Sequence, residues 1–138
     1  MVRLLPADAT DEQILALCRD WAERMAAGRV REALDVLWTP PDAEPSRRWT
    51  PESLTTYVAN HGSWIPTRDG STWRITSIRT AGPQPYLAEV LRREDDPRAG
   101  TVLLDVPLNG GRSGLTASFV FRPHEGRVVV ALHGLLVL

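Results

Sequence analysis

The sequence predicts an α+β protein in which N-terminal helices pack on a strongly curved C-terminal antiparallel β-sheet. Three observations support this class. Apolar residues recur at helical spacing up to Gly62, they alternate with polar residues after Gly70, and turns rich in glycine and proline separate the alternating stretches. A chain of 138 residues has the length of one ordinary domain. We therefore expect a single domain over residues 1–138.

Start and stop signals in the sequence predict the first two helices. Thr10 and Gln13 form a capping-box pattern, and apolar residues then follow at helical spacing until Gly28, a typical helix stop. A second, shorter helix over residues 30–39 is expected to end where two prolines prevent its continuation. The two helices should form a hairpin.

A third helix is predicted after a proline-rich surface connection over residues 39–48. Thr50 is its expected N-cap, Pro51 occupies its first turn, and Gly62 ends it. Trp49 is placed to pack on Leu54 as a hydrophobic staple.

The second half of the chain reads as a meander of hairpins. Turn residues such as Gly82–Pro83, Asn109–Gly110–Gly111 and Glu125–Gly126 separate alternating stretches. The expected strands cover residues 72–79, 86–93, 101–108, 115–122 and 128–137.

The last of these strands is apolar on both alternations except at His133 and Gly134. A strand of this kind is normally covered on both faces. The helices supply one cover, and we expect a second subunit to supply the other, which predicts a homodimer through the outer sheet face.

Composition excludes several classes of function. Sixteen basic against seventeen acidic residues leave a net charge of -1, so no field favours nucleic acid. Cys18 is the single cysteine, which excludes an internal disulfide, and three isolated histidines lack the ligand spacing of a metal site. No stretch reaches the roughly 18 apolar residues of a membrane span. We expect a cytoplasmic protein with no metal, no cofactor, no nucleic acid and no membrane among its partners.

The element order resembles the nuclear transport factor two-like superfamily, which includes ketosteroid isomerases and polyketide cyclases of the SnoaL type. The resemblance covers nearly the whole chain and rests on residues 21–28 (WAERMAAG) and residues 31–37 (REALDVL), a recurrent helix-pair opening of that superfamily. Residues 105–110 (DVPLNG) and 115–117 (LTA) also resemble a bacterial group within it that has no assigned activity.

The resemblance implies a cone-shaped, cystatin-like fold whose helices and sheet enclose an apolar cavity, and whose opposite sheet face commonly forms a dimer. It implies no particular reaction, because this fold hosts isomerases, cyclases, hydrolases, adaptors and proteins without chemistry.

Asp105 and His133 are the candidate catalytic residues. In isomerase-like members of the superfamily, a carboxyl group in an apolar cavity acts as a base or as a neutral hydrogen-bond donor. Alternation places Asp105 on the face opposite Val102 and Leu104, where it would otherwise bond a neighbouring strand or an arginine. A neutral His133 suits acid–base chemistry, but a lone histidine in a strand is also a common structural residue.

Tyr57, His61, Trp64 and Trp73 are the candidate ligand-binding residues. Tyr57 and His61 fall on one stripe of the third helix and would line a cavity mouth, although a histidine before Gly62 also caps a helix C-terminus. Trp64 and Trp73 belong to a group of five tryptophans concentrated in the helical half and its junction with the sheet. Tryptophan suits either a core or a ligand-cavity wall.

Three functions remain open on these grounds. The leading one is a cavity-bearing domain that binds an apolar small molecule or acts in regulation without catalysis. The second is a cofactor-independent isomerase or cyclase that uses Asp105 and His133. The third is a protein-interaction module, such as an immunity or adaptor protein.

Overall fold

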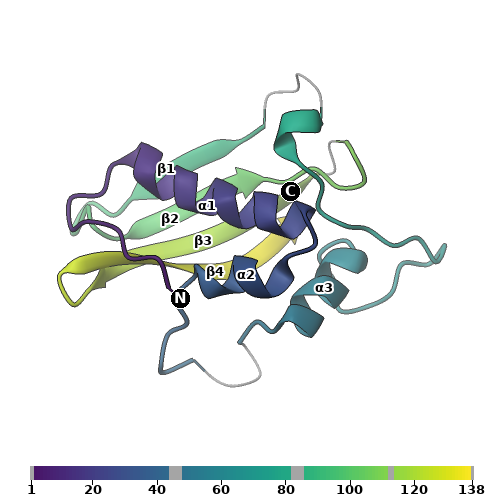
Figure 1. Cartoon of the computed structure of the whole chain (residues 1–138), viewed down its shortest axis with the longest axis horizontal. Coiled ribbons are helices and arrows are strands. Elements are labelled where there is room, and N and C mark those ends of the chain that lie inside the picture. Colours follow the sequence, from purple (N-terminus) through teal and green to yellow (C-terminus); the bar gives the residue numbers. More distant parts are fainter. Residues whose placement is uncertain (1, 44–47, 82–85, 112–113, 138) are drawn as a thin grey trace.

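A computed structural model describes residues 2–43, 48–81, 86–111 and 114–137 of the chain. Three α-helices precede a four-stranded antiparallel β-sheet that is not closed into a barrel, within these described residues. Helix α1 lies across one face of the sheet, and α2 and α3 follow near its lower edge in Figure 1. The α+β class predicted from the sequence is confirmed.

The first and third helices begin at the predicted caps. In α1 (Asp11–Ala26), the Thr10 hydroxyl accepts a hydrogen bond from the Gln13 amide, and the Gln13 side chain accepts one from the Thr10 amide. In α3 (Pro51–Ala59), Thr50 and Ser53 form the same reciprocal pair. Each box satisfies two amides that a helix start would otherwise leave without a partner.

Helix α2 (Val30–Asp35) ends four residues before the predicted limit at residue 39. The reason is tertiary. The amide of Trp38 donates a 2.8 Å hydrogen bond to the carbonyl of Val130 in the last strand, so the chain leaves the helix to pair with the edge of the sheet.

The sheet is a meander, as the turn pattern predicted. Its strands lie in sequence order with antiparallel neighbours throughout. They are β1 (Ala88–Arg92), β2 (Gly100–Asp105), β3 (Leu115–His124) and β4 (Arg127–Val137). The turn predicted at residues 82–83 lies outside the described residues.

The strand predicted over residues 72–79 is not formed, which corrects the sequence-based prediction. Ile75 makes a single isolated bridge to Leu108, and residues Ile78–Thr80 form a short 3₁₀ helix. The Glu23 carboxylate of α1 accepts hydrogen bonds from the Ser77 hydroxyl at 2.8 Å and from the Ile78 amide at 3.3 Å. These bonds draw the segment toward α1 and away from the sheet ladder.

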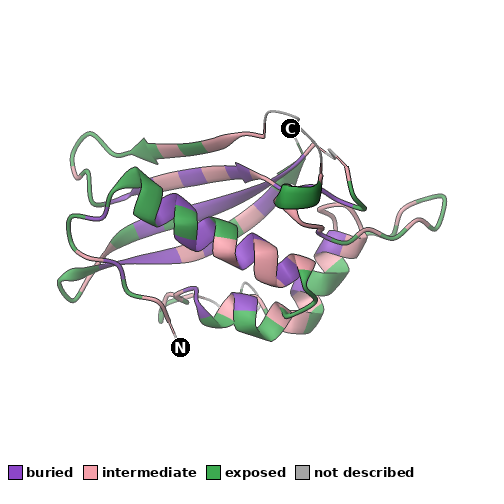
Figure 2. Ribbon diagram, turned by 45° about the horizontal axis from the view of Figure 1, so that its top comes forward, coloured by how far each residue is buried: buried purple, intermediate pink, exposed green. Residues whose placement is uncertain are grey.

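The core lies between α1 and the sheet face that points toward it, which we call the inner face. Figure 2 shows buried residues along the side of α1 that faces the strands and along the strands beneath it. Trp21 of α1 packs its ring edge on Phe119 of β3, with centroids 5.2 Å apart, and both side chains are fully buried.

The opposite, outer face of the sheet is partly covered by the chain itself. Val129 alternates with the inner residues Val128 and Val130 and pairs with Arg122, yet none of its surface is exposed. Trp38, paired to the same strand edge, lies against Arg122. The burial of Val129 therefore requires no partner subunit.

Candidate functional site

The inner face of the sheet holds a packed core where the sequence resemblance implies a ligand cavity. The largest side chains there have less than 2% of their surface exposed, and Trp21 and Phe119 interlock at its centre. Close packing of this kind fills the centre of the inner face.

A pocket of about 530 Å³ lies instead on the outer face, at the edge formed by β4. This volume falls in the usual range for small-molecule sites. We call it the aromatic pocket. One wall is aromatic and comes from the helical half, and the other comes from β3 and β4. The side chains that define it are Trp38, Trp49, Tyr57 and Trp64 on the first wall, Val120, Arg122, Ala131 and His133 on the second, and Arg48 beside them.

Trp38 reaches this pocket because the chain pairs with the sheet edge directly after α2. Its amide bonds Val130, and its ring lies under the Arg122 guanidinium, 4.3 Å from ring centroid to guanidinium carbon. This distance is within the range of a cation–π contact. The contact joins the two walls at one end of the pocket.

Trp49, Tyr57 and Trp64 form a cluster around α3. The Tyr57 ring is 5.5 Å from the Trp49 ring and 4.6 Å from the Trp64 ring, both edge-to-face, and Trp49 and Trp64 are stacked at 6.0 Å. The predicted cap at Thr50 places Trp49 at the start of the helix, one residue before the cap.

A left-handed turn after α3 returns Trp64 to Tyr57. His61 and Gly62 both have positive φ, and the Gly62 amide donates to the Tyr57 carbonyl at 2.9 Å. A β-carbon on Gly62 would lie 2.9 Å from a methyl group of Leu115, so glycine is required for both its backbone and its close approach to the sheet.

A β-bulge places His133 in the pocket. Phe119 pairs with Leu132 and the preceding Ser118 pairs with Gly134, which leaves His133 without a residue opposite it. Bulges of this kind redirect side chains and are frequent beside functional sites. His133 is exposed and lines the aromatic pocket.

The structure brings together three of the six predicted site residues. Tyr57, Trp64 and His133 share the aromatic pocket. His61 and Trp73 lie elsewhere, edge-to-face at 5.0 Å beside the loop of residues 67–71. The positive φ of His61 turns it away from the Tyr57 side of α3, which the helical-stripe prediction did not anticipate.

Asp105 is not among the residues that line the aromatic pocket. It lies on the outer face, as alternation predicted, and bonds β3 and the residue that precedes β1. One carboxylate oxygen accepts a 3.0 Å hydrogen bond from the Leu87 amide, and the other accepts a 2.7 Å bond from the Thr116 hydroxyl. This geometry matches the structural alternative, in which Asp105 bonds neighbouring strands.

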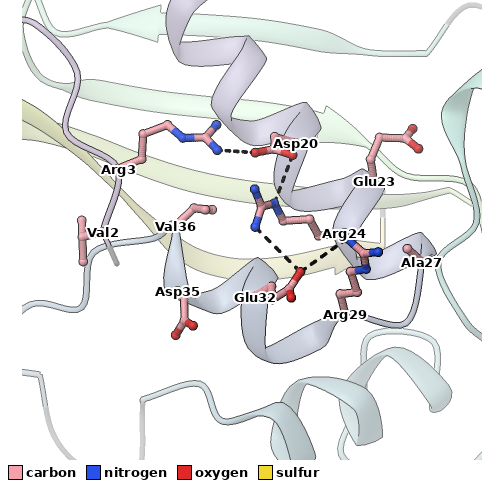
Figure 3. Close-up of a pocket in the computed structure, with 10 residues that line it drawn as sticks. All are labelled: Val2, Arg3, Asp20, Glu23, Arg24, Ala27, Arg29, Glu32, Asp35 and Val36. Atoms are coloured by element: carbon pink, nitrogen blue, oxygen red, sulfur yellow. Dashed lines mark hydrogen bonds and ion pairs between the residues drawn. The ribbon is translucent and has the colours of Figure 1, made fainter.

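The cleft between α1 and α2 is larger than the aromatic pocket, but ion-paired side chains line it. Figure 3 shows Asp20 between Arg3 and Arg24, and Glu32 between Arg24 and Arg29. All three of its arginines pair with Asp20 or Glu32, and we interpret these pairs as a structural network that joins the N-terminal segment to the two helices.

Burial makes Cys18 a poor nucleophile at neutral pH. It is fully buried among the apolar residues of α1, and this burial raises the pKa of its thiol to about 12. The reactive thiolate is therefore essentially absent under physiological conditions.

Trp38, Arg48 and Arg122 were not predicted as site residues. Trp49 was predicted only to pack on Leu54 as a hydrophobic staple. One signal was present: the tryptophans are concentrated in the helical half and its junction with the sheet. The pairing of Trp38 with Arg122 had no sequence signal, since 84 positions separate them along the chain (122 minus 38).

The described part of the chain also lacks a metal centre and a membrane-spanning helix. Its residues include no group of three or more His, Cys, Asp or Glu side chains placed to hold a metal ion. None of its helices combines the length and apolar character needed to cross a membrane.

Comparisons of the chain with protein-family models, with curated proteins and with solved structures found no match. The fold and the site together define an α+β protein with an aromatic pocket on the outer face of its sheet. The chemistry of that pocket follows from its own residues.

Proposed function

We propose that this chain binds a flat, apolar small molecule in the aromatic pocket and does not transform it. One observation carries the proposal: four aromatic rings, Trp38 after α2 and Trp49, Tyr57 and Trp64 around α3, line a single pocket of about 530 Å³. Large rings with few polar atoms favour a ligand that stacks or packs edge-to-face on them.

Binding is favoured over catalysis by the distribution of ionisable groups. The isomerase or cyclase alternative requires a carboxylate and a histidine that act on one ligand. His133 lines the pocket, but Asp105 does not, and both of its carboxylate oxygens already accept hydrogen bonds, from the Leu87 amide and the Thr116 hydroxyl. The described lining supplies no other carboxylate.

The proposal is tested with N-phenyl-naphthylamine, an uncharged aromatic probe whose fluorescence rises in apolar sites. We expect saturable binding to the native chain, and we expect Trp64→Ala to raise the dissociation constant about ten-fold, which corresponds to about 1.4 kcal/mol. Trp64 is 61% exposed, so its removal should leave the fold intact.

Ile65→Ala is the matched control, because Ile65 is the adjacent residue, is 75% exposed and does not line the pocket. It should bind the probe as the native chain does. If the native chain shows no saturable binding, or if both variants bind like the native chain, the aromatic pocket is not a ligand site.

The nuclear transport factor two-like architecture is part of the proposal. Its support is the order of the elements, with three helices before an antiparallel meander and the first helix packed on the sheet. In this chain the proposed ligand site lies on the outer face of the sheet, since the inner face is filled.

We also propose that two copies associate through the outer face of the sheet. Support comes from exposed apolar side chains there. Leu91 of β1 and Leu136 of β4 are on this face and are 46% and 41% exposed.

A further inference from the structure

The described residues that line the aromatic pocket carry positive charge and no carboxylate. Several arginines of this chain pair with carboxylates, among them Arg92 with Asp11 and Arg98 with Asp96. Arg122 forms no ion pair with any described residue, although it is exposed and lines the pocket.

The contact that positions Arg122 leaves its hydrogen-bonding capacity available. Its guanidinium carbon lies 4.3 Å from the centre of the Trp38 ring. A cation–π contact uses the charge of the guanidinium and none of its five N–H donors as a hydrogen bond to an acceptor atom. The ring holds the side chain at the pocket wall, where these donors match a carboxylate or a similar anion.

Arg48 adds a second positive charge to the same pocket. Its Nε donates to the Ala43 carbonyl at 3.2 Å and its terminal nitrogen donates to the Pro41 carbonyl at 3.1 Å. Carbonyl groups satisfy the N–H donors but do not cancel the charge. The described lining of the pocket therefore carries two arginines and no aspartate or glutamate.

The combination of aromatic rings with two arginines favours an anionic ligand over a cationic one. Aromatic cages that bind cations present open ring faces and negative or neutral surroundings. Here Arg122 already lies over the Trp38 ring, and an incoming cation would meet two like charges. An anion would meet two opposite charges.

We propose that the ligand is a planar aromatic molecule bearing an anionic group, such as a carboxylate or sulfonate. Arg122 binds the anionic group, and the rings of Trp49, Tyr57 and Trp64 hold the aromatic body. This inference rests on the proposed function and adds the chemical class of the ligand.

The experiment compares two probes that share one aromatic skeleton. Anilinonaphthalene sulfonate carries an anionic group, and N-phenyl-naphthylamine lacks it. Titrations followed by probe fluorescence are made with the native chain and with Arg122→Gln, Arg122→Lys and Arg79→Gln. Arg79 is exposed, lies outside the pocket and forms no ion pair with described residues, so its variant matches the loss of charge alone.

We expect the native chain to bind the sulfonate about ten-fold or more tightly than the uncharged probe. Arg122→Gln should raise the dissociation constant of the sulfonate about ten-fold and leave that of the uncharged probe within about two-fold. Arg122→Lys should retain part of the preference because it keeps the charge. Arg79→Gln should behave as the native chain does.

The outcomes separate this inference from the proposed function. If both probes bind equally well and Arg122→Gln changes neither, the anionic class is wrong while the aromatic binding site stands. If Arg122→Gln weakens both probes equally, Arg122 shapes the pocket and does not select charge, which also overturns the inference. Failure of the uncharged probe to bind the native chain would remove the proposed function itself, and this inference with it.

Discussion

At the scale of single residues, the pKa of Asp20 is set more by its two arginine partners than by its partial burial. Its carboxylate accepts hydrogen bonds from Arg3 at 2.5 Å and from Arg24 at 3.1 Å (Figure 3). Partial burial alone would raise the pKa of this carboxyl group. The hydrogen bonds and charges of Arg24 and Arg3 exceed that effect and hold the pKa of Asp20 below its usual value of 3.8.

Asp20→Asn is expected to lower the free energy of unfolding by about 1 kcal/mol near pH 7, because asparagine keeps the shape but loses the charge. The folded-state pKa of Asp20 is depressed, so its stabilisation is complete above the unfolded-state pKa of about 3.9 and is lost as pH falls through the lower folded-state value. Urea unfolding of both proteins should therefore differ near pH 7 and converge at low pH.

Asp35→Asn is the control, since Asp35 lines the same cleft but is exposed and has no ion pair with any described residue. Its unfolding curve should match that of the native chain. A difference between Asp20→Asn and the native chain that stays constant at every pH would show that the ionised carboxylate is not its source.

At the scale of elements, Gly100 allows a close approach of β1 to β2. This glycine pairs with Arg92, and a β-carbon added to it would lie 2.1 Å from the Leu91 carbonyl oxygen and 2.8 Å from the Phe121 ring. The nearest obstacle is backbone, which cannot move without separating the strands. Any larger residue therefore disrupts the pairing of β1 with β2.

Gly100→Ala is expected to reduce the free energy of unfolding by about 3 kcal/mol, within the range of severe overpacking. The midpoint of urea unfolding measures the change. Gly134→Ala in β4 is the matched control, because no atom lies within 4 Å of its added β-carbon. That control should unfold within about 0.5 kcal/mol of the native chain. Equal midpoints for Gly100→Ala and the native chain would contradict the close approach.

The segment of residues 72–79 shows the limit of local pattern at this scale. Its alternation is typical of a strand, but Glu23 accepts hydrogen bonds from Ser77 and Ile78, and the side chain of Asn109 bonds the backbone of Arg74. The backbone of Arg74 and Thr76 bonds that of Asn109 and Pro107, and beyond this short pairing side-chain partners take the place of a ladder. A pattern of period two cannot distinguish the two arrangements.

At the scale of the whole molecule, the aromatic pocket joins parts of the chain that are distant in sequence. Trp38 arrives through the edge of β4, Trp49 and Tyr57 through α3, and His133 through the bulge opposite Ser118. A ligand in this pocket would contact the helical half and the sheet together. Ligand binding should therefore stabilise the packing of α3 on the sheet, because it favours only the folded arrangement.

Light scattering tests the proposed homodimer at this scale. We expect a mass twice the 15.3 kDa of the chain at micromolar concentration, and we expect Leu136→Arg to shift it to that of one chain, since a charge would enter an apolar interface. Leu4→Arg is the control, because Leu4 is 47% exposed and lies in the N-terminal segment before α1. A single-chain mass for the native protein would contradict the dimer.

The sequence by itself determined the features that depend on near neighbours. The capping boxes at Thr10 and Thr50 start α1 and α3, the turn residues produce the meander, and alternation places Asp105 on the outer face. These signals act through contacts between residues a few positions apart, where geometry follows from the period of a helix or strand.

The tertiary structure alone decided the end of α2, the loss of the expected strand over residues 72–79 and the composition of the site. Trp38 and Arg122 meet only because Trp38 pairs with the edge of β4, and His133 enters the pocket only because the register shifts between Ser118 and Phe119. Edge pairing and register result from the combined energy of many distant contacts. No local pattern at Trp38 or His133 carries that information.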